Sequence, residues 1–197
     1  MNKLFIISSL FLFFAGYGIK IKENQRAIIP TTNEPQSAFE YLNKIRAAPA
    51  SFSSEIGVDL SYVKPIHALI WNDTLAKVAN AKALDMATRN YVGHIDPDGN
   101  GLNIKINAAG YLLNSSWISN KSDNFFESIN AGSSTGIETI KNLIIDEGIV
   151  PPGHRIHLLG LDSFYASCYD IGIGFVNGAD KSNYQTYCCV IIAKHDF

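Results

Sequence analysis

The spacing of apolar residues changes along this chain. An almost continuous apolar run occupies residues 4–14 and is followed by small residues and then by lysines. Several segments between residues 36 and 147 repeat apolar positions every three or four residues, which is the period of a helix with one buried face. Two dense apolar runs beyond residue 168 are typical of strands. Helices first and strands last predict an α+β fold rather than alternating β-α-β units.

The helical period predicts five helices, over residues 36–47, 50–56, 73–91, 101–109 and 136–147. Asn72 or Asp73 can cap the longest of them, because a short side-chain oxygen accepts hydrogen bonds from first-turn amides. About half of that helix's circumference is apolar and rich in alanine, and Lys82 is expected on its polar side. Strands are expected over 169–176 and 184–193, joined by a hairpin loop.

The N-terminal segment has the pattern of an export signal. Residues 1–18 carry one charge, Lys3, then an apolar run of about a dozen residues and a small-residue exit, as in a secretory signal peptide. The run is short for a membrane span, and an uncleaved N-terminal anchor is the alternative. Residues 19–35 are predicted to be a spacer and 36–197 a single domain. We therefore expect a secreted or cell-envelope protein that touches a membrane only through this segment.

Composition narrows the class of protein further. The 197 residues are 47% hydrophobic, and 16 basic against 18 acidic side chains give a net charge of −2. High apolar content with low net charge excludes a disordered chain. A dedicated nucleic-acid binder normally carries a basic excess, so no nucleic-acid partner is expected.

Four polar residues are candidates for a shared site. His94 lies in a turn-rich segment after the longest predicted helix, and His154 follows a Pro-Pro stop. Glu127 stands in an apolar stretch, where a carboxylate is costly to bury unless it is paired. Asp146 ends a predicted helix, where an acid opposes the dipole unless it has a cationic partner. Two imidazoles and two carboxylates suit zinc or another divalent ion; the alternative is four unrelated structural roles.

Several short motifs support the hypothesis that these four residues lie at one site. They are Trp71-Asn72-x-x-Leu75 with Ala79, Gly93-His94-x-x-Pro97-Asp98-Gly99, Glu127-Ser128-Ile129-Asn130-Ala131-Gly132, Gly153-His154-Arg155 with Leu158-Leu159, and Gly172-Ile173-Gly174-Phe175. In order and spacing this set, over about residues 36–194, resembles the CAP superfamily (cysteine-rich secretory, antigen 5, pathogenesis-related 1) in its bacterial form.

The resemblance implies an α-β-α sandwich with a central antiparallel sheet and a large cleft. It also implies that the cleft carries His94, Glu127, Asp146 and His154. Asp146 stands where the family usually has Glu, and Ser128 stands where it usually has Asn. If the two histidines share a site, their side chains should lie within about 8 Å of each other.

Three functions are compatible with such a cleft. We favour a binding module that holds a ligand, a metal ion or a partner without turnover. The alternative is a metal-dependent peptidase or esterase in which His94 and His154 hold zinc and Glu127 acts as base. A third reading is an extracellular structural domain with a vestigial cleft. The family resemblance implies lipid or sterol binding and envelope or host components as partners.

The cysteines give one further expectation. Export permits disulfides, and the predicted hairpin could bring Cys168 near Cys188 or Cys189. Adjacent strand residues point to opposite faces, so only one of the latter two can face Cys168. The other should be a buried thiol. A cysteine–histidine nucleophile is the disfavoured alternative, because nothing in the sequence places a histidine beside a thiol.

Overall fold

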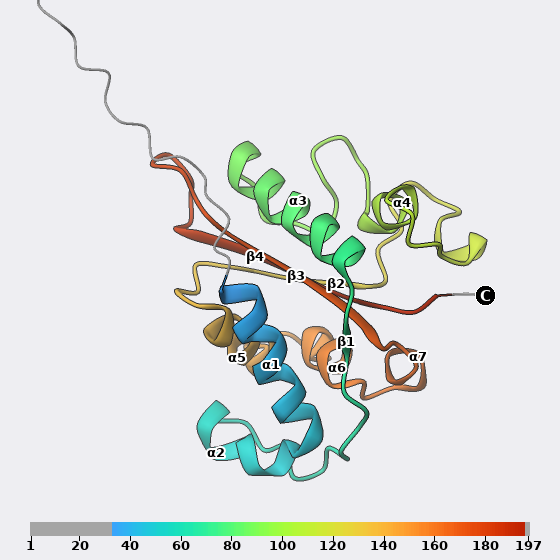
Figure 1. The fold of residues 1–197 in the computed structure, drawn as a ribbon. Coiled ribbons are helices and arrows are strands. Elements are labelled where there is room, and N and C mark those ends of the chain that lie inside the picture. The colour runs from blue at the N-terminus through green and yellow to red at the C-terminus, as the bar shows by residue number, and fades with distance from the viewer. Residues whose placement is uncertain (1–32, 196–197) are drawn as a thin grey trace, which may run out of the picture.

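The computed structural model describes residues 33–195 (Figure 1). Its helices are α1 (Glu34–Ala47), α2 (Ser53–Ile56), α3 (Asp73–Arg89), α4 (Leu102–Ala108), α5 (Gly136–Ile145), α6 (Gly153–Leu159) and α7 (Ser163–Ala166). Two short 3-10 turns, Pro49–Phe52 and Ser115–Trp117, accompany them. The strands are β1 (Ile70–Trp71), β2 (Glu127–Ala131), β3 (Asp170–Asn177) and β4 (Thr186–Ala193).

The strands form one central sheet in the order β1-β3-β4-β2. β3 and β4 form an antiparallel hairpin, and β2 adds to β4 in the antiparallel direction as an edge strand. The two-residue β1 pairs with β3 in parallel. The predicted α-β-α sandwich is confirmed, and its sheet is antiparallel except for this short edge.

Helices cover both faces of the sheet (Figure 1). α3 and α4 lie on one side, and α1, α5 and α6 lie on the other. α3 packs most extensively on β3 and β4, while α1 contacts α5 and β3. All residues of β4 and all but the last of β3 are buried, as expected for strands covered on both faces.

Two glycines let α3 lie very close to the sheet. A Cβ at Gly172 would collide with the backbone of Leu75 and Ala76, and one at Gly174 with the backbone of Ala79 and Asn80. Glycine is used where one backbone must approach another this closely. The position of α3, and of the segment that follows it, therefore depends on these two residues.

Most of the predicted helices and both predicted strands are confirmed within a few residues. Asn72, rather than Asp73, caps α3 by accepting hydrogen bonds from Thr74 and Leu75. The sequence pattern missed β2 and α6, although both carry residues of the candidate site. In β2 the polar Glu127, Ser128 and Asn130 obscure the alternation of a strand, because polar residues face both sides.

The predicted disulfide is wrong. Cys168, Cys188 and Cys189 are free thiols, and all three are buried. The hairpin register pairs Cys189 with Gly174, six residues beyond Cys168, which is about 20 Å along a strand. Disulfides need Cα atoms within roughly 7 Å of each other. Burial raises the pKa of Cys168 to about 11 and that of Cys188 to about 12, so both remain protonated thiols.

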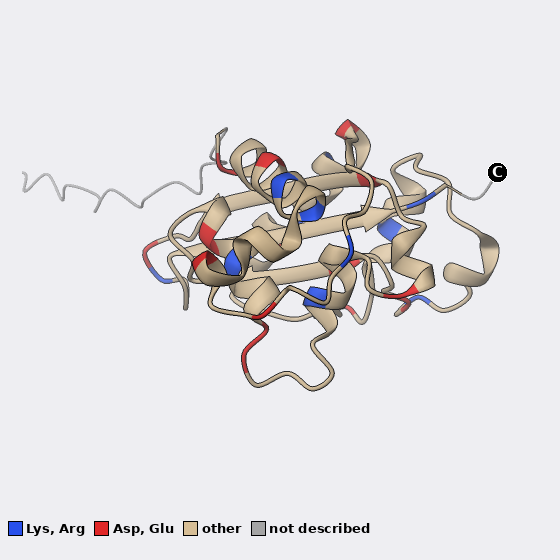
Figure 2. Cartoon of the chain, turned by 90° about the horizontal axis from the view of Figure 1, so that it is seen from below, with Lys and Arg blue, Asp and Glu red and all other residues tan. Residues whose placement is uncertain are grey.

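The predicted signal peptide, residues 1–18, and nearly all of the predicted spacer, 19–35, lie outside the described residues. No helix within 33–195 combines the length and apolar character needed to cross a membrane. Figure 2 shows basic and acidic residues interspersed over the helices and loops, and neither sign gathers in one broad area in that view.

Candidate functional site

The first half of the site joins a loop to the edge strand. Asn90 ends α3 in the left-handed conformation, and the chain then turns back so that His94 reaches the start of β2. There the His94 Nδ1 lies 2.8 Å from Glu127 Oε2. A carboxylate only accepts hydrogen bonds, so this ring nitrogen is the donor.

Glu127 is enclosed by polar groups from three other segments. Its Oε2 also accepts from the Asn124 amide at 3.0 Å, and its Oε1 lies 3.6 Å from Cys189 Sγ and 3.8 Å from Lys82 Nζ. The Glu127 side chain has no solvent exposure. Both oxygens are engaged inside the protein, so this carboxylate orients His94 and is not presented to water as a base.

The second half of the site comes from one short segment, between the end of α5 and the start of α6. Asp146 caps the C-terminus of α5 in the left-handed conformation, with φ of 52°. Its Oδ1 accepts from His154 Nδ1 at 2.7 Å and its Oδ2 accepts from the His154 backbone amide at 2.9 Å. Arg155 donates to the carbonyls of Ile144 and Ile145. This guanidinium places a positive charge at the C-terminus of α5, where a cation interacts favourably with the helix dipole.

The two halves meet. The ring centroids of His94 and His154 lie 6.2 Å apart, with 33° between the ring planes, which confirms that they lie within 8 Å. The His94 side chain is 45% exposed and the His154 side chain 25%, whereas both carboxylates are buried. Because Glu127 lies on the edge strand β2, and α6 also contacts β2, the two loops reach each other across that edge.

The hydrogen bonds to the two carboxylates determine which ring nitrogens stay without a partner. In both rings Nδ1 carries the proton given to a carboxylate, so in a neutral imidazole Nε2 keeps its lone pair. Neither Nε2 has a hydrogen-bond partner among residues 33–195. A carboxylate on one ring nitrogen, with the other left free, is the usual support of a metal-binding histidine.

The donor set fits a metal site with two protein ligands. Zinc binds imidazole nitrogen at about 2 Å, so rings centred 6.2 Å apart would have to move slightly closer to share one ion in tetrahedral geometry. No group of three or more His, Cys, Asp or Glu side chains within 33–195 has metal-binding geometry. A closed structural zinc site is therefore not provided there, and an ion held by His94 and His154 would keep positions for other ligands.

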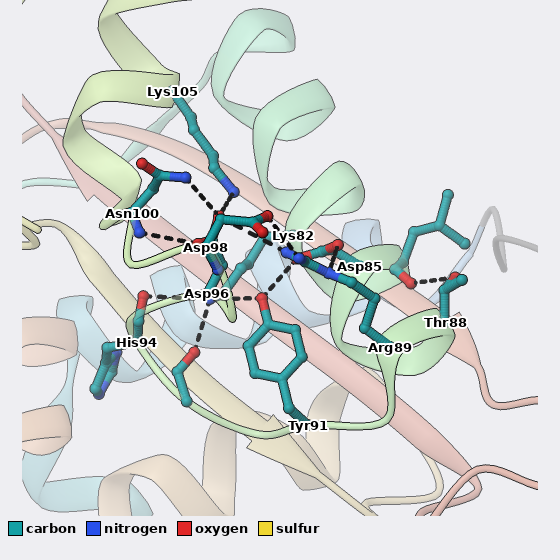
Figure 3. A network of polar contacts seen from close by, with 12 residues as sticks. Lys82, Asp85, Thr88, Arg89, Tyr91, His94, Asp96, Asp98, Asn100 and Lys105 are labelled. Atoms are coloured by element: carbon teal, nitrogen blue, oxygen red, sulfur yellow. Dashed lines mark hydrogen bonds and ion pairs between the residues drawn. The ribbon is translucent and has the colours of Figure 1, made fainter. Parts of the chain in front are cut away.

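Sequence reasoning missed Lys82. The helical pattern predicts it on the polar side of α3, yet only 3% of the residue is exposed. Its ammonium lies beside Glu127 and donates to the carbonyl oxygens of Gly93 and His94 at 2.7 and 3.2 Å (Figure 3). The buried Glu127 is the one signal in the sequence that called for such a partner, because a buried carboxylate needs compensation.

A second histidine of α6 has a structural role. His157 lies one turn after His154 but points into the core, where Ser128 donates to its Nδ1 at 2.7 Å. Its Nε2 donates to the Ile192 carbonyl at 3.3 Å. Burial lowers the pKa of His157 to about 4, which keeps the ring neutral. Successive residues of β2 thus serve opposite faces, with Glu127 toward α3 and Ser128 toward α6.

Two solved structures are similar to this chain. An outer surface protein from Borrelia burgdorferi has 14% identity and a TM-score of 0.54, over 86% of this chain and 98% of that one. An extracellular protein containing an SCP domain, from Bacillus anthracis str. Ames, has 18% identity and a TM-score of 0.49 over 81% of this chain. This chain spans 41% of the length of the Bacillus protein. The Borrelia structure supports the fold assignment alone.

No curated protein sequence matches this chain. A sequence model of the cysteine-rich secretory protein family, CAP, matches residues 39–191. That match covers most of the chain and includes both histidine–carboxylate pairs. The fold, the order of the motifs and this match agree, and the chain belongs to the CAP family.

Proposed function

We propose that this chain is an exported binding domain whose cleft holds a divalent metal ion, zinc in the first instance, on His94 and His154. The observation that carries the proposal is the 6.2 Å approach of two imidazoles, each tied through Nδ1 to a buried carboxylate. The carboxylates fix the tautomers and ring directions, which prepares two Nε2 atoms for a common ligand. A bound ion would supply Lewis acidity and open coordination positions.

The surroundings of the site support an amphipathic partner. Apolar residues next in sequence to the site are exposed, namely Val92, Ile95, Phe125, Ile149 and Val150. Exposed apolar groups beside polar ones are typical of interaction surfaces. We infer a lipid, a sterol or another envelope or host component, with its polar end at the histidines and its apolar part along these side chains.

The location of the domain is inferred from its N-terminal segment and from a similar solved protein. The apolar segment at residues 4–14 predicts export. The similar solved protein from Borrelia burgdorferi is described as an outer surface protein. We therefore place this domain outside the cytoplasm, either secreted or at the cell envelope.

A metal-dependent hydrolase is the second candidate, and the carboxylate–imidazole pairs favour it. A carboxylate at Nδ1 is also how a histidine that binds a catalytic metal is oriented. In this candidate His94 and His154 hold the metal, and Glu127 acts as base only if it is released from its contacts with His94 and Lys82. Peptide and ester substrates tested with and without chelator separate the candidates: chelator-sensitive turnover supports the hydrolase, and equal background rates exclude it.

Calorimetric titration with zinc tests the favoured function. We expect one site in the wild type and at least a tenfold weaker affinity in His94→Ala and in His154→Ala, because each removes one of two ligands. His67→Ala is the matched control, since His67 is an exposed histidine on the segment before β1, and its affinity should equal that of the wild type. No zinc binding by the wild type, or equal binding by all four proteins, contradicts the proposal.

A further inference from the structure

A lysine without solvent contact lies in the middle of α3. Only 1% of the Lys82 side chain is exposed, and its neighbours on the same face include Val78, Ala79 and Met86. Burying an ammonium is costly unless it is paired and hydrogen-bonded. An apolar residue of similar size would usually fill such a position at no loss of stability. Packing alone therefore does not explain a lysine here.

The contacts of this ammonium converge on the first half of the site. Lys82 Nζ donates to the Gly93 carbonyl at 2.7 Å, to the His94 carbonyl at 3.2 Å and to the Tyr91 hydroxyl at 3.3 Å. It also lies 3.8 Å from Glu127 Oε1. Figure 3 shows Lys82, Tyr91 and His94 within one polar network. The donors of one side chain thus hold the carbonyls on both sides of the His94 Cα.

We propose that Lys82 is the positioning residue of the His94 half of the cleft. It acts at two points: it fixes the backbone that carries His94, and it holds Glu127 so that Oε2 faces His94 Nδ1. This role rests on the proposed function. It assigns to Lys82 the orientation of one of the two imidazoles that would bind the metal ion. Lys82 does not itself touch the ligand.

The other half provides an internal control. His154 is held by Asp146 through both its ring and its backbone amide, and within the described residues no lysine is hydrogen-bonded or ion-paired to either of them. A change at Lys82 that only loosened the fold would affect both histidines. A positioning role predicts a change at His94 alone.

Histidine side-chain NMR separates these outcomes. Long-range proton–nitrogen spectra at pH 8, where ordinary imidazoles are neutral, should show the Nδ1-protonated tautomer for both His94 and His154 in the wild type. In Lys82→Met we expect His94 to become a tautomer mixture while His154 keeps its pattern. Zinc affinity should fall about tenfold. Lys77→Met, at an exposed lysine of the same helix, should change neither measurement.

Two further variants separate the loss of the charged donor from a failure to fold. Lys82→Arg keeps a charged donor at the position and should restore the His94 tautomer at least in part. If Lys82→Met does not fold, Lys82→Gln retains a neutral donor at lower cost of burial and should show the same selective change at His94.

The outcomes for the two proposals differ. If the wild type binds zinc but the uncharged Lys82 variant leaves the His94 tautomer and the zinc affinity unchanged, the positioning role is overturned and the proposed function stands. Equal changes at both histidines also overturn it. If the wild type binds no zinc, the proposed function fails, and the NMR comparison still decides the role of Lys82.

Discussion

The two histidine–carboxylate pairs have similar local geometry but are built from different parts of the fold. His94 and Glu127 are 33 residues apart and come from a loop and an edge strand, whereas Asp146 and His154 are separated by 8 residues around one helix end. Glu127 is supported by Lys82 from α3 and contacts Cys189 of β4. One half thus depends on the packing of the whole domain and the other on a local turn.

Because of this difference, the two histidine–carboxylate pairs should be disrupted by different substitutions. A tertiary contact is lost when any of the elements that meet there moves, whereas a local contact survives as long as its own segment keeps its shape. Removing the contacts of Lys82 with Glu127 and with the Gly93 and His94 carbonyls should therefore release His94 alone. Changing the helix end between α5 and α6 should release His154 alone.

Gly174→Ala should have the largest effect, because the new Cβ collides with the α3 backbone at Ala79 and Asn80. We expect a loss of about 3 kcal/mol in the free energy of unfolding, measured by urea denaturation. Gly153→Ala is the matched control, since that glycine has open space around its Cα. Similar losses for both variants would refute the close approach of α3 to β3.

Glu127→Gln should cost more than Asp146→Asn. The first leaves the Lys82 ammonium buried without its counter-charge, which should cost about 3 kcal/mol. The second weakens two hydrogen bonds within one short segment and leaves no buried ammonium unpaired, which should cost about 1 kcal/mol. Urea denaturation of both variants at pH 7 measures the difference. Equal costs, or a larger cost for Asp146→Asn, would contradict the contrast between the two halves.

His157 should make the fold sensitive to mild acid. Its folded-state pKa of about 4 lies below the ordinary 6.5. Between these two pH values the unfolded chain binds a proton at His157 and the native state does not, so the native state loses stability as the pH falls. Between pH 7 and pH 5 the free energy of unfolding should fall by about 2 kcal/mol from this group alone. His157→Gln should lose that part of the pH dependence. Identical pH dependence in wild type and variant would show that His157 is not buried in neutral form.

Arg155→Met should lower stability as little as Asp146→Asn does, and its effect should be the most local one. Removing the donor to the last carbonyls of α5 should cost about 1 kcal/mol. The tautomer of His154 should become mixed while that of His94 stays single, the reverse of the result expected for Lys82→Met. Lys64→Met, at an exposed lysine, is the control. A change at His94 would mean that the two halves are coupled more tightly than their contacts indicate.

The sequence predicted the class of fold and the proximity of His94 and His154, but for different reasons. Helical period identified α3 and α5, while His94 and Glu127 were brought together by the motif resemblance and not by their spacing. Lys82 was missed because an amphipathic pattern assigns lysine to solvent, and only the tertiary position of Glu127 makes its burial favourable. The disulfide failed because hairpin composition does not determine strand register, and register separates Cys168 from Cys188 and Cys189.

The most direct test of the central claim is a crystal structure of the domain soaked with zinc and measured at the zinc absorption edge. We predict a single strong anomalous peak between the Nε2 atoms of His94 and His154, with Glu127 and Asp146 still bonded to the Nδ1 atoms. An ion bound elsewhere, or no anomalous peak at a saturating zinc concentration, would contradict the account.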